Sequence, residues 1–341
     1  TTIALLSMAS ASVFGMYGPD SDWITFLTDG NRFRARADQL GFTLGNDMIK
    51  GTFGFRNKGF NGEYYGGMLE SATDTPTGST TQAGAGFFYD FVPTISMGIG
   101  YTSSLISVGV GYNATIGNRW DRYNNKDNPK KVEAVAHTPV LVLNALDNAF
   151  RMAIPIQVYV NKDKGPESEG NWKSDITAVS VDSQFRYYTG LEMLPQVRLY
   201  LRYGNVSTKS EASGTTIKGL LYESFGFDFR IYFGATVEEV ALQPFVKLVY
   251  NGALGYTGYT RVEAVKYMKG QYTDAVGYKG TPKWDLQLMP ALGLTANSDI
   301  VSLYLEPSIG LSVKQNGHAT QKNVKEVYGL GYNVYAEIYI T

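Results

Sequence analysis

The segment 330–340 alternates between apolar and polar side chains with a period of two residues. One side carries Leu330, Tyr332, Val334, Ala336, Ile338 and Ile340, and the other carries Asn333, Tyr335, Glu337 and Tyr339. Because successive side chains of a β-strand point to opposite faces, this pattern predicts a strand with one apolar and one polar wall. Similar strands recur along the chain and are long and rich in Tyr and Gly. The pattern therefore predicts an all-β protein, a transmembrane antiparallel β-barrel with apolar residues toward lipid.

The periodic segments predict about 14 strands, within a range of about 12 to 16. They are 32–43, 48–56, 62–71, 83–91, 95–116, 133–145, 149–160, 175–188, 195–204, 217–233, 238–250, 283–294, 299–313 and 324–341. The apolar phase changes near Ser103 and Ser104, so the segment 95–116 contains either a bulge or a turn between two strands. Alternating glycines such as Gly98 and Gly111 indicate close approach between strands.

The connections between these strands alternate between short and long. The short ones are 144–148, 189–194, 234–238 and 295–299, and the long polar ones are 117–131, 161–174, 205–216, 251–282 and 314–323. Outer-membrane barrels have short periplasmic turns and longer extracellular loops. We therefore expect the long stretches outside the cell and both chain termini on the periplasmic side.

The polar faces of the later strands carry charges of both signs, which we interpret as pore-lining. The candidates are Arg151, Asp182, Arg186, Arg198, Arg202, Asp228, Arg230, Lys247, Glu306 and Glu337. Facing lipid, each Arg or Lys near the midplane would cost roughly 2–4 kcal/mol, whereas the opposite faces hold residues such as Phe227 and Leu303. These charges either line a water-filled pore or pair with one another and keep a narrow barrel closed. Arg32, Arg34 and Arg36 form a further basic stripe.

The first residues resemble an export signal. The run Ile3–Ala11 is short, apolar and ends in small residues, as in the core and cleavage site of a signal peptide. Cleavage after Ala11 or after Gly15 fits, and we favour Gly15, which gives a residual signal at 1–15 and a barrel at 16–341. A buried helix or strand is the alternative. No other stretch is long and apolar enough for a membrane helix.

Composition excludes several classes of chemistry. The chain has no Cys, two His and a net charge of −1, which argues against disulfides, a metal site and a nucleic-acid partner. We expect neither an enzyme nor a cofactor, since His137 and His318 lie in no recognisable triad. A barrel enzyme would need one of these histidines. A secreted soluble β-protein is the other alternative, and it would be extracted without detergent.

The stretch from Trp23 to Phe42, together with Gly51–Arg56, resembles the variable surface proteins of Brachyspira spirochaetes. The resemblance covers roughly residues 1–60 and implies an abundant outer-membrane protein exposed at the cell surface, with a role in antigenic variation. It supplies no catalytic residues.

We therefore expect an outer-membrane protein at the cell surface, most simply a porin-like channel for ions and small solutes with variable exposed loops. The alternative is a non-conducting surface antigen or adhesin. The expected partners are outer-membrane lipid, small solutes or ions, host surface molecules or antibodies, and further copies of the chain in a homo-oligomer.

Overall fold

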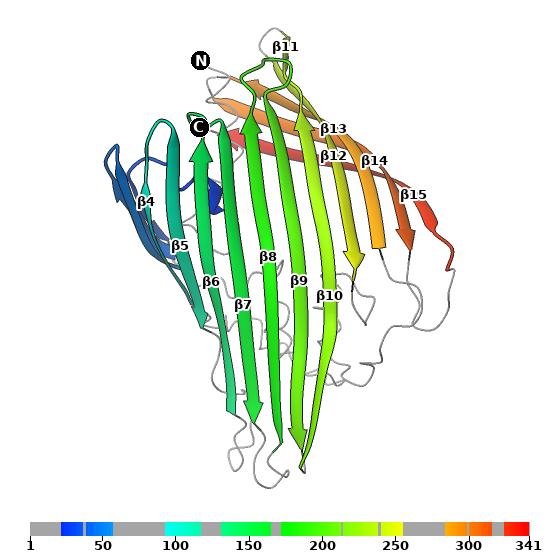
Figure 1. The fold of residues 1–341 in the computed structure, drawn as a ribbon. Coiled ribbons are helices and arrows are strands. Elements are labelled where there is room, and N and C mark those ends of the chain that lie inside the picture. Colours follow the sequence, from blue (N-terminus) through cyan, green and yellow to red (C-terminus); the bar gives the residue numbers. More distant parts are fainter. Residues whose placement is uncertain are drawn as a thin grey trace.

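A computed structural model shows one large, strongly curled antiparallel sheet (Figure 1). The structure describes residues 22–36, 39–56, 93–116, 131–164, 172–212, 214–237, 240–254, 284–298, 300–315 and 324–340. Fourteen strands follow one another across the sheet in sequence order, and β11 pairs with β12 beside this path. The predicted all-β antiparallel sheet of about 14 strands is confirmed. Among the described residues no pairing joins β1 to β15, so closure into a barrel stays a prediction.

One short helix precedes the strands, the 3-10 helix η1 (Asp22–Thr25). The strands are β1 (Arg32–Arg36), β2 (Gln39–Gly45), β3 (Ile49–Arg56), β4 (Thr94–Tyr101), β5 (Ile106–Ile116), β6 (Lys131–Ala145), β7 (Phe150–Lys164), β8 (Lys173–Tyr188), β9 (Gln196–Ala212), β10 (Thr215–Tyr232), β11 (Ala235–Val237), β12 (Val240–Ala253), β13 (Trp284–Asn297), β14 (Val301–Gln315) and β15 (Val327–Ile340).

Two predicted strands are divided in the structure. The segment 32–43 forms β1 and β2, which pair with each other, so its prediction as one strand is wrong. The segment 95–116 forms β4 and β5, which also pair. Of the two explanations for the phase change near Ser103, the turn is therefore confirmed. At this turn the Ser103 hydroxyl donates to the Ile106 carbonyl at 2.6 Å and accepts from the Ile106 backbone N–H at 3.2 Å.

The predicted long loop at 205–216 is wrong. There β9 and β10 continue as paired strands to a tight turn at Gly214, which has a φ of 81°. The sequence pattern missed this because the outward positions of β9 become polar after Tyr203, and polar residues carry no period-two signal. These strands form a tall wall with their neighbours, and β6 to β10 reach well below β12 to β15 in Figure 1.

Several predictions lie outside the described residues. They are the signal peptide at 1–15, the strands at 62–71 and 83–91, most of the loops at 117–131, 251–282 and 314–323, the middle of the loop at 161–174, and His318.

The two faces of the sheet have opposite polarity. We call the face against which η1 packs the inner face, and the other the outer face. In β5 the inner side chains Ser107 and Asn113 are buried, whereas the outer side chains Val108 and Val110 are 40% and 54% exposed. Soluble proteins bury apolar rather than polar side chains, and they rarely expose a contiguous apolar surface of this extent. The polarity of the two faces is thus the reverse of that in a soluble protein, with buried polar and exposed apolar side chains.

Candidate functional site

The N-terminal segment that contains η1 packs on a patch of glycines in the inner face. Trp23 is fully buried. A Cβ added at Gly111 would lie 2.4 Å from the Trp23 ring, and one added at Gly98 would lie 2.7 Å from it. One added at Gly100 would meet Leu27 at 2.4 Å. The absence of side chains at these glycines therefore makes room for Trp23 and Leu27 of the N-terminal segment. This packing, more than the predicted close approach between strands, explains the glycines.

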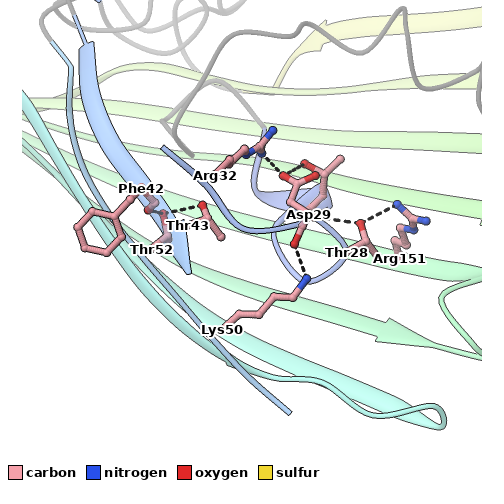
Figure 2. Close-up of polar contacts among 9 residues, drawn as sticks. Thr28, Asp29, Arg32, Phe42, Thr43, Lys50, Thr52 and Arg151 are labelled. Carbon is pink, nitrogen blue, oxygen red and sulfur yellow. Dashed lines mark hydrogen bonds and ion pairs between the residues drawn. The ribbon is translucent and has the colours of Figure 1, made fainter. Parts of the chain in front are cut away.

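Polar contacts hold the same segment at its end, as Figure 2 shows. The Asp29 carboxylate pairs with Arg32, and the Lys50 ammonium donates to the Asp29 carbonyl. From the other side, Arg151 donates to the Thr28 hydroxyl at 3.1 Å. Arg151 was predicted to line a pore, and it is engaged in holding the N-terminal segment to the sheet.

All ten predicted pore-lining residues lie on the inner face, because the strand registers place them on the same side of the sheet as Arg151 and Asp182. The structure brings Asp182 to Arg202, with 3.3 Å between carboxylate and guanidinium. It also brings Asp228 to Arg230 at 2.8 Å and to Lys247 at 3.5 Å. Their role in a pore stays a prediction.

Glu306 and Glu337 are separate from these ion pairs. Glu306 accepts a hydrogen bond from the Tyr304 hydroxyl, and Glu337 accepts from the hydroxyls of Tyr335 and Tyr339. The described part of the chain shows no ion pair for either carboxylate. The inner face is therefore predominantly basic over β7 to β12, whereas over β14 and β15 the carboxylates of Glu306 and Glu337 outnumber the one cation, Lys314.

Three inner-face tyrosines were not predicted as part of the site. Arg151 lies over the Tyr188 ring at 4.8 Å, Arg198 over Tyr232 at 4.6 Å and Arg230 over Tyr200 at 5.1 Å. Such cation–π contacts are attractive and also fix the plane of the guanidinium. The signal for them was present in the sequence, since Tyr200 has the same parity as Arg198 and Arg202.

The apolar surface of the outer face ends at a common level on β9 and β10. There the Tyr203 hydroxyl donates to the Glu223 carboxylate at 2.6 Å. Aromatic side chains with a polar tip are enriched at membrane–water boundaries. Beyond this level the outer positions of β9 are polar. Lys209 pairs with Glu211, and the Lys209 ammonium holds the pKa of the Glu211 carboxyl below its usual value.

His137 lies on the outer face and contacts the Tyr112 hydroxyl through Nδ1. No group of three or more His, Asp or Glu among the described residues is arranged to hold a metal ion. No helix in the same residues has the length and apolarity to cross a membrane.

The fold and its surfaces define a class: an all-β protein built on one long antiparallel sheet, with an exposed apolar outer face and a polar, charged inner face. The chain belongs to the Serpulina hyodysenteriae variable surface protein family, whose model matches residues 1–341. This confirms the resemblance to spirochaete variable surface proteins. Searches of curated proteins and of solved structures gave no match. The family description supports a surface antigen better than the expected porin-like channel.

Proposed function

We propose that the protein is an outer-membrane β-barrel that serves as a surface antigen and displays its long polar connections and the β9–β10 hairpin outside the cell. The inverted polarity of the sheet carries this proposal, because an apolar outer face is stable only when something other than water covers it. Lipid fits a face that is apolar on strand after strand and ends at Tyr203 and Glu223. Membership of a variable surface protein family supports the location at the cell surface.

Closure of the sheet is part of this proposal. In a membrane every edge strand must satisfy its backbone N–H and C=O groups, and an open sheet edge in lipid leaves them unpaired. The fourteen strands of the main path alternate in direction, so β1 and β15 are antiparallel to each other. They can therefore pair as neighbouring strands of a closed antiparallel barrel.

The topology can be tested by cysteine labelling, because the chain contains no Cys. Ser207 lies on the β9–β10 hairpin, and Ser104 is exposed in the short β4–β5 turn at the other end of the sheet. On intact cells we expect a membrane-impermeant maleimide to label the Ser207→Cys variant. The matched Ser104→Cys variant should react only after the outer membrane is disrupted. The reverse order would contradict the proposed orientation, and equal labelling would contradict insertion in the membrane.

A solute channel is the second candidate function. The observation that favours it is the partial exposure of inner-face charges, since the side chains of Arg202 and Lys247 are both 28% exposed. Single-channel recording of the folded, detergent-purified protein in planar bilayers tests this function. Uniform conductance steps that change when Lys247 is replaced by Gln are expected of a channel. A folded protein without conductance would contradict the channel function and leave the surface antigen as the only proposed function.

A further inference from the structure

Five cationic side chains form one lateral row across the inner face. In the strand registers Arg151 lies opposite Arg186, and Arg186 lies opposite Arg198. Arg198 in turn lies opposite Arg230, and Arg230 lies opposite Lys247. Each of the adjacent strands β7, β8, β9, β10 and β12 thus contributes one cation at the same level. We call these five residues the basic row.

The basic row is unfavourable for stability on its own. Like charges directly opposite each other on neighbouring strands repel. Among the described side chains on the inner face of β7 to β10 and β12 there are six cations, the row and Arg202, against two carboxylates, Asp182 and Asp228. A fold can hold such a row only where other contacts of the cations offset the repulsion between them.

The two carboxylates neutralise only one end of the row. Asp228 accepts two hydrogen bonds from Arg230, at 2.8 and 2.9 Å, and also pairs with Lys247. Asp182 pairs with Arg202, which lies outside the row. The positive charges of Arg151, Arg186 and Arg198 are not paired with a carboxylate anywhere in the described chain.

The contacts of these three arginines are to neutral groups. Arg198 donates to the Gln196 side chain at 2.9 Å, and Arg186 reaches the Gln184 side chain at 3.5 Å. Arg151 donates to the Asn148 carbonyl at 3.1 Å. The Nε of Arg186 is buried and has no hydrogen-bond partner among the described residues. A buried guanidinium donor without a partner is costly, and an anion placed there would remove that cost.

We propose that the basic row is a binding site for an anion that carries several phosphate groups. A guanidinium presents a planar fork of N–H donors that matches phosphate oxygens, and its charge-assisted hydrogen bonds are stronger than neutral ones. Neighbouring strands are about 4.8 Å apart, so the four strands from Arg186 to Lys247 span roughly 14 Å. A chain of phosphates can contact several cations of the row at once. The site uses only the inner face of the sheet and does not depend on the proposed membrane location.

The test is calorimetric titration of the folded, detergent-purified protein with inorganic tripolyphosphate, at an ionic strength held constant with NaCl. We expect saturable binding that the Arg198→Gln variant weakens about tenfold or more, as the loss of one charge-assisted contact predicts. The matched control is Lys314→Gln, which removes an inner-face cation on β14, outside the row. It should change the affinity by less than about twofold, as expected for a distant, screened charge.

Two further measurements keep the proposal falsifiable. The Arg198→Lys variant preserves the charge but loses the planar fork, and it should bind tripolyphosphate more weakly than the native chain. Inorganic phosphate alone should bind more weakly than tripolyphosphate because it reaches fewer cations. Absence of saturable binding by the native chain would overturn the proposal. So would equal affinities for the native, Arg198→Gln and Lys314→Gln proteins, which would make the row a repulsive cluster only.

Discussion

Replacing Phe227 with Arg is expected to reduce the yield of folded, membrane-inserted protein at least about tenfold. Phe227 lies on the outer face of β10, within its apolar run, and its ring stacks on Tyr250 at a centroid distance of 5.8 Å. An Arg near the bilayer midplane costs roughly 2–4 kcal/mol, and about 1.4 kcal/mol already corresponds to a factor of ten in an equilibrium. Heat-modifiable migration in electrophoresis of membrane fractions measures the folded yield.

The control for this variant is Thr177→Arg. Thr177 is an exposed outer-face residue of β8, opposite Ser207, at a level where the outer face of β9 is already polar. We expect the folded yield of Thr177→Arg to stay close to that of the native chain. The neighbouring Gly226 is unsuitable as a control, because a Cβ there would lie 2.6 Å from the Asn251 side chain. Similar yields for Phe227→Arg and Thr177→Arg would refute the lipid-facing assignment of the outer face.

Replacing Gly111 with Val is expected to lower the free energy of unfolding by about 3 kcal/mol. The new side chain cannot share its position with the Trp23 ring, so either the sheet is strained or the N-terminal segment leaves it. Overpacking costs roughly 1–3 kcal/mol, and loss of a buried Trp contact costs roughly 3–5 kcal/mol. Urea unfolding of the detergent-folded protein, followed by tryptophan fluorescence, measures the change.

Gly331→Val is the matched control, because Gly331 is also an inner-face glycine of a strand. A Cβ at Gly331 would have no atom within 4 Å. We expect this substitution to change stability by less than about 1 kcal/mol, within the range of strand propensities. If both glycine variants lost the same stability, the packing of Trp23 would not explain the requirement for glycine at position 111.

The two faces of each strand could be predicted from the sequence, because the period of two is a local property. The alternation of Phe225, Phe227 and Phe229 with Asp228 and Arg230 assigns both faces of β10 without any tertiary information. The registers in the structure agree with these assignments for all ten predicted inner-face residues.

What the sequence could not predict depends on contacts between distant segments. Trp23 and Gly111 are 88 positions apart, and nothing near either residue reveals that they touch. The basic row depends on the register of four strand pairs, and a shift of one residue in any pair would have placed its members on opposite faces. The extension of β9 past residue 204 was missed because the outer positions of β9 after Tyr203 are polar.

The extension of β9 and β10 beyond the apolar surface has a consequence for sequence change. Between Asn205 and Ala212 strand β9 is joined to β8 and β10 by backbone hydrogen bonds, which do not depend on the identity of the side chains. Polar residues can therefore be exchanged there at little cost to folding, whereas a coiled loop packed by its own side chains would have to be repacked. The exposed side chains of this paired segment can therefore vary between sequences while its backbone structure stays the same.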